Sequence, residues 1–354
     1  MNIKIFSQNK LTLLYQNKIL LHLLVFFLGI TSSFSLPPYN LFYLNFISYP
    51  TLLWILLLYT KEKIISFTLG LIFGFGYFIS NLYWITYSLT FDDIFKPLIP
   101  FALILIPLFL ALFYGFSTLT FAFFNPKKNI LSILILATSL SLFEYLRSFL
   151  FGGFPWNLIA FSFVDYLEFI QLLSITGTYA FNSIIILLFL LPITLFFNCK
   201  KNIKIMLFSF SLLISFTNFF WGNLNLKKHE LSEKKDLEFS IKIVSPKVNI
   251  NRFFQNENPR ELITELINTS MPNRSKKTIF VLPEGIIPNI YFEDFKNFKT
   301  LFSNNFSKKH IIILGMNIYD KNKVYNSLVA LNNELDVLQI YYKNKLVPFG
   351  EFLP

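Results

Sequence analysis

The sequence predicts a bundle of about seven membrane-spanning helices followed by an α/β domain. Two observations lead to this prediction. The 354 residues are 54% hydrophobic and only 14% charged, whereas soluble domains contain roughly 25% charged residues. The apolar excess lies in residues 1–223, where apolar runs near the length of a membrane span alternate with short basic loops. Residues 224–354 are polar and charged, so we expect the domain boundary between residues 223 and 224.

Lysines in alternate loops predict the orientation of the bundle. They concentrate before the first run and after the second, fourth and sixth runs. The positive-inside rule then places the N-terminus in the cytoplasm, and an odd number of spans places residues 224–354 on the outer side. The first run has the basic start of a signal peptide, but further apolar runs follow at once and favour a retained span. The predicted spans are Ile19–Phe34, Leu41–Tyr59, Ile64–Leu89, Leu98–Phe124, Ile130–Leu150, Leu167–Phe197 and Ile205–Trp221.

Residues 224–354 alternate between β-prone runs and helical segments, as α/β domains do. Asn258, Pro259 and Glu261 predict a helix start, with the asparagine as its cap. The continuous apolar run Thr278–Leu282 is typical of a sheet that is covered on both faces. No helix follows the last strand, so we expect this domain to be incomplete at its C-terminus. The expected strands are Glu238–Val244, Thr278–Leu282, His310–Leu314, Tyr325–Leu331 and Asp336–Tyr342, with helices Asn258–Asn268 and Phe292–Phe306 and a turn at Asn332–Glu334.

Charged side chains directly follow two of the β-prone runs. Glu284 comes after Thr278–Leu282, and Lys343 comes after Asp336–Tyr342. In open α/β folds, ligands and catalytic groups collect at this edge of the sheet. The loop around Glu284 is stiff and mostly apolar, which favours a partly desolvated carboxylate acting as a base. The alternative interpretation is a solvated loop glutamate without a catalytic role. Lys343 could pair with a carboxylate or stabilise an oxyanion. Glu351, in a Pro/Gly-containing turn, is either functional or a structural acceptor of backbone N–H groups.

A second candidate element is the loop GGFPWN (Gly152–Asn157) between the fifth and sixth runs. The predicted orientation places it on the same outer side as residues 224–354. A tryptophan at a membrane interface is usually an anchor. Because the glycines and the proline give this loop a defined shape, we also expect Gly153, Pro155 and Trp156 to help seat a lipid.

Together these segments resemble the bacterial apolipoprotein N-acyltransferases. That family joins a multi-span bundle to an extracytoplasmic domain of the nitrilase (carbon–nitrogen hydrolase) superfamily, whose triad is Glu, Lys and Cys. The segment LPEGIIP resembles the family's segment around the base, which implies that role for Glu284. The segment YYKNKLVPFGEFLP resembles the lysine segment, which implies catalytic Lys343 and a supporting Glu351. GGFPW resembles the family's loop between two spans, and Tyr325–Ser327 fits the strand before the lysine.

The resemblance implies transfer of an acyl chain from a phospholipid to the N-terminal amine of a lipoprotein's diacylglyceryl-cysteine. The reaction would pass through a cysteine thioester and use no cofactor. The implied location is the bacterial inner membrane, with the nitrilase-like domain on the periplasmic side.

Two departures from the family pattern matter. The family's nucleophilic cysteine lies beyond the lysine segment, and the single cysteine here, Cys199, falls at the cytoplasmic end of a predicted span. We therefore expect a truncated or split member with no nucleophile in this chain, inactive alone. In addition, the strand ending at Val244 runs into SPKVNINRFF, where the family has a glutamine and then a tryptophan; Phe253 and Phe254 stand near the tryptophan position.

Other function classes fit the sequence less well. The net charge of +11 comes from scattered lysines rather than a basic stripe, which argues against nucleic acid. His22, His229 and His310 have no metal-ligand spacing, so no metal site is predicted. A non-catalytic membrane binding or transport protein with a remnant nitrilase-like domain stays open, and it predicts ionisable residues inside the spans; Glu144 and Glu168 lie near predicted span ends. An anchored amidase would need only one span.

Overall fold

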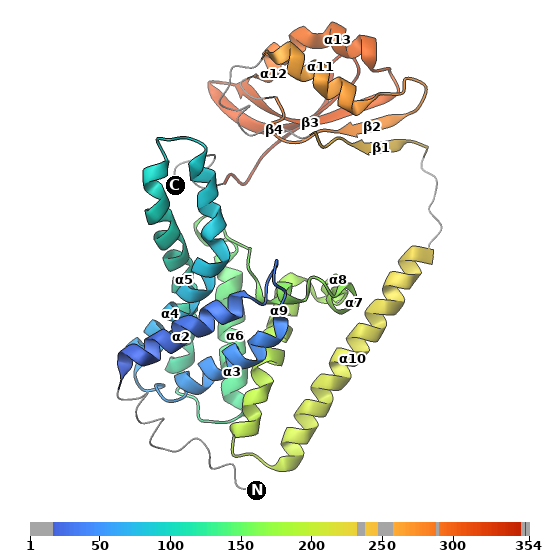
Figure 1. The fold of residues 1–354 in the computed structure, drawn as a ribbon. Coiled ribbons are helices and arrows are strands. Elements are labelled where there is room, and N and C mark those ends of the chain that lie inside the picture. Colours follow the sequence, from blue (N-terminus) through green and yellow to red (C-terminus); the bar gives the residue numbers. More distant parts are fainter. Residues whose placement is uncertain (1–16, 232–237, 247–257, 288–289, 348–350, 352–354) are drawn as a thin grey trace. The chain divides into compact units, whose positions relative to one another are not determined.

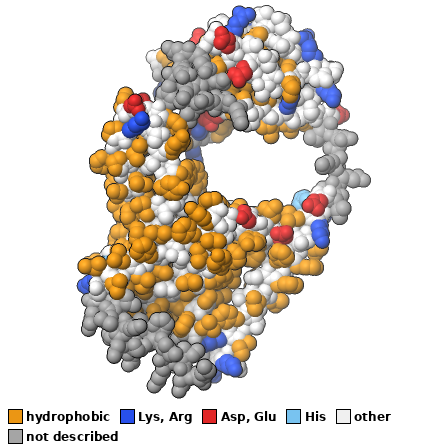
Figure 2. Space-filling view, in the orientation of Figure 1, with side chains coloured by type: hydrophobic (Ala, Val, Ile, Leu, Met, Phe, Trp, Pro, Cys, Tyr) orange, Lys and Arg blue, Asp and Glu red, His pale blue; other side chains and the backbone are white. Residues whose placement is uncertain are grey.

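The computed structural model describes residues 17–231, 238–246, 258–287, 290–347 and 351. Phe253 and Phe254 therefore lie outside the described residues. The chain divides into two compact units, Met1–Ser232 and Glu233–Pro354. We call them the helical unit and the sheet unit (Figure 1). Hydrophobic side chains cover most of the visible surface of the helical unit, whereas Lys, Arg, Asp and Glu are frequent on the sheet unit (Figure 2).

The helical unit contains helices of very different lengths. In chain order they are α2 (Lys18–Ser33), α3 (Asn45–Leu56), α4 (Lys63–Leu82), α5 (Ile99–Phe123), α6 (Ile130–Arg147), α7 (Leu167–Ile170), α8 (Leu173–Thr176), α9 (Thr178–Leu190) and α10 (Lys201–Leu231). Short 3₁₀ segments lie between them at Phe42–Leu44, Tyr83–Thr90, Lys96–Leu98, Leu150–Gly152, Ile159–Phe163 and Leu191–Phe196.

Within the described residues, five helical stretches are long and apolar enough to cross a membrane. They are Lys63–Thr90, Lys96–Phe123, Ile130–Arg147, Thr178–Phe196 and Lys201–Glu230. Four of them coincide with the third, fourth, fifth and seventh predicted spans. The first two predicted spans form shorter apolar helices, Lys18–Ser33 and Phe42–Leu56. The sixth is interrupted because Gly177 adopts a φ of +74° and ends α8, so only its second part is long enough.

Small residues bring the long helices of this unit close together. A Cβ on Gly29 of α2 would collide with the carbonyl of Phe73 on α4, and one on Gly70 of α4 would collide with Thr118 of α5. The hydroxyl of Thr118 donates to the carbonyl of Ser66 over 2.7 Å. Close approach at small residues and hydrogen bonds between helices are the usual means of holding a membrane bundle together.

The sheet unit is a five-stranded mixed sheet with the order β1-β2-β3-β4-β5. Strands β1, β2 and β3 are parallel, and β4 and β5 extend the sheet in antiparallel fashion. Helices lie on one face of the sheet (Figure 1). The elements are β1 (Ser240–Ile243), α11 (Pro259–Ser270), β2 (Thr278–Val281), α12 (Phe292–Phe295), α13 (Lys299–Asn305), β3 (His310–Asp320), β4 (Lys323–Leu331) and β5 (Val337–Tyr342).

The local signals in this unit are confirmed at the start of α11 and in the β4–β5 turn. The side chain of Asn258 caps α11 by accepting from the N–H of Arg260 over 3.0 Å. In the turn, Asn332 Oδ1 accepts from the N–H groups of Glu334 and Asp336 over 2.8 and 2.9 Å. These asparagines satisfy backbone donors that would otherwise lack a partner.

Two expectations about the strands are wrong. Strand β3 does not end at Leu314 but continues to Asp320 and forms a hairpin with β4. The turn residues Lys321 and Asn322 both have positive φ, the geometry of a tight hairpin turn, and a lysine gives no sequence signal for it. Burial in β2 alternates along the strand, and Ile243 of the adjoining strand is 77% exposed, so the described residues cover one face only.

Candidate active site

Glu284 lies just beyond the end of β2 and against β3. The N–H of Leu282 donates to the carbonyl of Ile313 over 2.8 Å, so the pairing with β3 continues past the strand end. At Gly315 of β3, an added Cβ would lie 2.8 Å from the Cα of Glu284. Only glycine allows the Glu284 backbone this approach. Gly315 could not be singled out from the sequence, because this contact depends on the fold.

The predicted desolvation of Glu284 is not observed. Its side chain is 62% exposed, although the loop around it is apolar. The reason is that Ile286 and Ile287 are buried in the core beneath the loop instead of surrounding the carboxylate. Glu284 is therefore open to a reaction partner from the solvent side.

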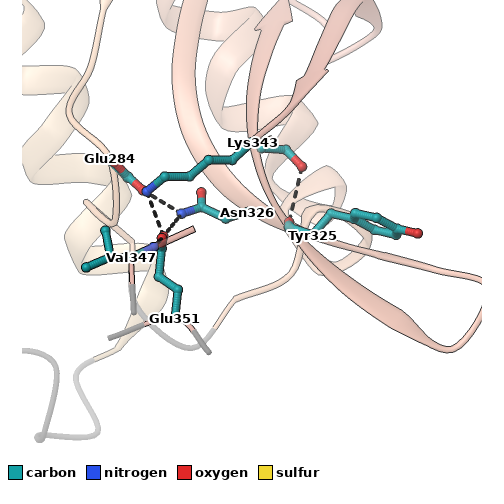
Figure 3. A network of polar contacts seen from close by, with 7 residues as sticks. Glu284, Tyr325, Asn326, Lys343, Val347 and Glu351 are labelled. Carbon is teal, nitrogen blue, oxygen red and sulfur yellow. Dashed lines mark hydrogen bonds and ion pairs between the residues drawn. The ribbon is translucent and has the colours of Figure 1, made fainter. Parts of the chain in front are cut away.

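Lys343 is positioned by the β4–β5 pairing. Its backbone N–H donates to the carbonyl of Asn326 over 2.9 Å, one residue beyond the end of β5. Asn326 lies in β4 opposite Asn317 of β3. The same backbone contact therefore brings the side chains of Lys343 and Asn326 together, and both reach toward the carboxylate of Glu284 (Figure 3).

Two nitrogen donors and two carboxylate oxygens form the centre of the site. The Nζ atom of Lys343 lies 3.4 Å from Glu284 Oε1 and 2.7 Å from Glu351 Oε1. The Nδ2 atom of Asn326 donates to the same two oxygens, over 2.6 Å in each case. All four side chains point inward to this cluster (Figure 3). The structure thus brings together the three site residues that were predicted around the sheet, Glu284, Lys343 and Glu351.

Glu351 makes contacts of two kinds. Its Oε2 atom accepts the backbone N–H of Val347 over 2.7 Å, as expected for a structural carboxylate. Its Oε1 atom accepts from Lys343 and Asn326, as expected for a residue that supports the lysine. One carboxylate therefore fixes both the turn and the ammonium group.

The charges at the site stabilise one another. The hydrogen bond to Glu351, together with the negative charges of Glu284 and Glu351, raises the pKa of Lys343 above its usual range. The hydrogen bond from Lys343, with further bonds from Val347 and Asn326, lowers the pKa of Glu351. The lysine is therefore held as a cation and Glu351 as an anion, which suits Lys343 to stabilise negative charge on a bound group.

A pocket of about 480 Å³ opens beside this cluster. Glu284, Asn326 and Glu351 form its polar side. Ile287, Ile290, Met316, Val324 and Leu346 supply apolar lining. Such a pocket can accept a group with a polar reacting centre and an apolar extension. Among the described residues, no three His, Cys, Asp or Glu side chains gather closely enough to hold a metal ion.

Asn326 is the member of this cluster that sequence reasoning did not single out. Its position in Tyr325–Ser327 was noted, but not a role for its side chain. The side chain of Asn326 lies on the same face of the strand as exposed Leu328 and opposite Asn317. This position can be recognised only when the strand register is known.

The loop residues Gly153, Pro155 and Trp156 belong to the helical unit. Gly153 has a φ of +82°, and a Cβ there would collide with the carbonyl of Ser148, so this position needs glycine. Pro155 is exposed, and Trp156 is 52% exposed. The indole of Trp156 stacks on that of Trp84 with 5.8 Å between ring centroids. Cys199 also belongs to the helical unit, where it follows the 3₁₀ segment Leu191–Phe196.

Comparison with known proteins agrees with the motifs. The profile of the apolipoprotein N-acyltransferase N-terminal domain matches residues 28–191. Curated apolipoprotein N-acyltransferases are similar over most of the chain. The Brucella melitensis protein is 26% identical over 353 residues, covering 94% of this chain and 65% of its own length. The Rhodopseudomonas palustris protein is 27% identical, covering 92% of this chain and 64% of its own length. The Rickettsia prowazekii protein is 31% identical over 294 residues, covering 80% of this chain and 57% of its own length.

The chain thus spans slightly less than two thirds of the length of the curated relatives that it matches. The matches run through both the helical and the sheet unit, and the apolar helices fit a bacterial membrane protein. Residues 28–191 thus match the N-terminal domain of the apolipoprotein N-acyltransferase family, and the chain is similar over most of its length to curated members of that family.

Proposed function

We propose that this chain carries the membrane bundle and the Glu–Lys part of a site that transfers an acyl chain from a phospholipid to the N-terminal amine of a lipoprotein's diacylglyceryl-cysteine. The observation that supports this most directly is the cluster in which Lys343 Nζ lies 2.7 Å from Glu351 and 3.4 Å from Glu284. A carboxylate and an ammonium at this separation can serve one reacting group as base and as oxyanion partner.

Each residue has a distinct role in the proposed reaction. Glu284 takes the proton from a cysteine thiol, and the thiolate attacks the phospholipid ester carbonyl. Lys343 stabilises the resulting oxyanion, and Glu351 with Asn326 keeps the ammonium in place. Glu284 returns the proton to the lysophospholipid oxygen as this oxygen leaves, and the acyl group remains on the cysteine as a thioester. The lipoprotein amine then attacks the thioester, Glu284 receives its proton, and the amide forms as the thiol is regenerated.

The thiol is the part that this chain does not supply to the cluster. We propose that Cys199 is not the nucleophile, because the proposed topology places it at the cytoplasmic side while Glu284 lies on the periplasmic side. In that topology seven spans cross the inner membrane, the N-terminus is cytoplasmic and residues 224–354 are periplasmic. A cysteine other than Cys199 then completes the triad.

The pocket supports a lipid-derived acyl group as substrate. Its apolar side can hold the first methylenes of the chain while the carbonyl faces Glu284 and Lys343. Residues Gly153, Pro155 and Trp156 are proposed to contact the lipid within the helical unit. The exposed Trp156–Trp84 pair gives that loop an aromatic surface suited to acyl chains.

One observation favours a second candidate function. A membrane binding or transport protein predicts ionisable residues inside its spans, and Glu144 and Arg147 of α6 are 2% and 1% exposed. Their hydrogen-bond partners are protein groups, including Tyr114 and Asn182 for Glu144. A substrate pathway would instead leave such groups facing water, so we rank this function below acyl transfer.

The proposal is tested with a completed chain, in which a cysteine-carrying segment of a curated relative follows residue 354. The completed chain is placed in vesicles with an alkyne-tagged phospholipid and a diacylglyceryl-cysteine peptide, and the acylated peptide is measured by mass spectrometry. Lys343→Met should abolish transfer. Lys299→Met is the matched control, because Lys299 also lies between two carboxylates, 3.1 Å from Glu334 and 3.9 Å from Asp336. Equal transfer by both variants would remove Lys343 from the mechanism.

A further inference from the structure

The helical unit contains a buried arginine that the proposed reaction does not use. Arg147, the last residue of α6, is 1% exposed, and Glu144, one turn earlier on the same helix, is 2% exposed. A guanidinium keeps its charge in proteins, and a charge inside an apolar bundle is costly unless other groups compensate it. The partners of Arg147 therefore indicate what this arginine does.

Arg147 holds the loop that follows it. Its Nη1 atom donates to the carbonyls of Phe154 and Trp156, over 2.8 Å in each case. In return, the N–H of Phe154 donates to the carbonyl of Arg147 over 2.7 Å. The guanidinium carbon also lies 5.2 Å from the ring centroid of Phe78 and 5.8 Å from that of Phe154. One side chain thus contacts the loop backbone at two points and an adjoining helix at a third.

The loop needs such support because its backbone is unfavourable. Phe151 and Asn157 are not glycines, yet their φ angles are +55° and +57°. Residues in this region persist only where their surroundings hold them. Tyr77 of α4 adds a second support, since its hydroxyl donates to the carbonyl of Asn157 over 2.9 Å.

Glu144 is held in turn by groups from two other helices. Its Oε1 atom accepts from the hydroxyl of Tyr114 on α5 over 2.9 Å. Its Oε2 atom accepts from the side chain of Asn182 on α9. The Oδ1 atom of Asn182 accepts the N–H of Ala160, in the 3₁₀ segment that follows the loop. The carboxylate is therefore fixed near Arg147 by contacts that also reach the far end of the loop.

We propose that Arg147 is a positioning residue, which holds the loop carbonyls so that Trp156 is fixed in its stack on Trp84. The carboxylate of Glu144, one turn earlier on the same helix, is the buried opposite charge. The stacked pair then presents a preformed aromatic wall to an acyl chain of the phospholipid donor. Both indoles are about half exposed, 52% for Trp156 and 47% for Trp84, so the wall is accessible. The acyl-chain ligand rests on the proposed function, whereas the positioning of Trp156 by Arg147 does not.

The first experiment measures the tryptophan stack in the full chain in detergent. Trp54→Phe and Trp221→Phe leave only the stacked pair, whose close parallel indoles (5.8 Å, 23°) give an exciton couplet in circular dichroism. Arg147→Lys keeps the positive charge near Glu144 but loses the rigid, planar guanidinium whose Nη1 atom reaches both carbonyls. We expect this variant to unfold near the parent's midpoint and to lose most of the couplet.

Two further variants make the result decisive. Glu144→Gln with Arg147→Met removes both charges, so the bundle should regain stability while the couplet stays lost. Lys204→Met is the matched control, because Lys204 Nζ also donates to a backbone carbonyl of this unit, that of Leu195, over 2.8 Å; it should leave the couplet unchanged. A full couplet in either folded Arg147 variant overturns the positioning role.

A second measurement tests the acyl chain. In the same background, phospholipids brominated along the acyl chain should quench the fluorescence of the stacked pair, and Arg147→Lys should reduce this quenching. Quenching that is absent in the parent overturns the lipid ligand while the couplet result stands. Neither measurement uses acyl transfer, so failure of the proposed reaction would be seen separately.

Discussion

Each of the two units contains one cation with carboxylate neighbours, a single carboxylate in the helical unit and two in the sheet unit, in opposite settings. Glu144 and Arg147 of the helical unit are 2% and 1% exposed. The side chains of Glu284, Lys343 and Glu351 in the sheet unit are 62%, 28% and 22% exposed. The charged groups are similar in kind, but their different burial suits them to different roles. The buried cluster fixes a structure, whereas the exposed one is available to a reacting group.

The physical reason lies in what happens when one partner is removed. In a buried cluster the remaining charge has neither water nor a counter-ion, so the loss is large. In an exposed cluster water replaces the missing partner, so stability changes little. The difference between the clusters can therefore be measured by substitutions of matched chemistry.

The largest expected effect on stability is that of Glu144→Gln. The substitution removes the buried negative charge one turn from Arg147 and leaves the buried guanidinium uncompensated, so we expect a loss of about 3–5 kcal/mol in the free energy of unfolding. Unfolding of the full chain by denaturant in mixed micelles measures this loss. Glu334→Gln, in an exposed pair with Lys299, is the control, and we expect a change of about 1 kcal/mol or less. Similar losses in the two variants would contradict the contrast between the clusters.

The next largest effect concerns Asn326, which connects both carboxylates of the exposed cluster. Asn326→Leu keeps the side chain's size but removes the donor to Glu284 and Glu351. We expect transfer by the completed chain to fall about 10²-fold, the scale of a misplaced reacting group, with little change in stability. Asn268→Leu, at an exposed position on α11, provides the control. If both variants retain full transfer, Asn326 does not position Glu284.

Gly315→Ala should have a smaller effect through the same carboxylate. The new Cβ would lie 2.8 Å from the Cα of Glu284, so the backbone of one strand or the other must shift. Overpacking of this kind costs about 1–3 kcal/mol, and the shift moves Glu284 away from Lys343. The melting temperature and the transfer rate should both fall. The control is Ala330→Gly in the neighbouring strand, which reports the change in stability alone. Gly177→Ala cannot serve as a control, because Gly177 has a positive φ.

The smallest effect is the pH dependence of the exposed cluster. Because folding raises the pKa of Lys343, its contribution to stability is present below the ordinary lysine value of about 10.4 and is lost as pH rises through the raised pKa. Because folding lowers the pKa of Glu351, its contribution is present above about 4.3 and is lost as pH falls through the lowered pKa. Hydrogen exchange of the Lys343 amide should therefore be slowest, relative to α11, within this window. Protection that stays constant on both sides of it would contradict the coupling.

The sequence was most informative where a short segment determines its own structure. The cap at Asn258 and the turn at Asn332 depend on side chains that bond to the nearest backbone groups, so both were predictable. Glu284 and Lys343 could be selected because they follow β-prone runs and match family motifs, and Glu351 because it lies in the lysine motif. The side chain of Asn326 could not be assigned a role, because that role depends on strand register.

The helical unit shows the same limit. Hydropathy located the apolar runs, but Gly177 interrupts one of them through a backbone angle that hydropathy does not report. Glu144 does lie near the end of α6, as expected from the sequence, and Arg147 is the last residue of this helix. Their burial depends on Tyr114, Asn182 and the loop carbonyls, which come from distant parts of the chain.

The most direct test of the central claim is acyl transfer by the completed chain carrying Glu284→Gln, compared with Glu334→Gln. The amide keeps the shape of the side chain but cannot accept the proton of the thiol or the amine. The proposed function predicts that Glu284→Gln lowers the rate by about 10²–10⁴-fold, as loss of a general base does, while Glu334→Gln transfers normally. Normal transfer by the Glu284→Gln chain would contradict the assignment of this cluster as the acyl-transfer site.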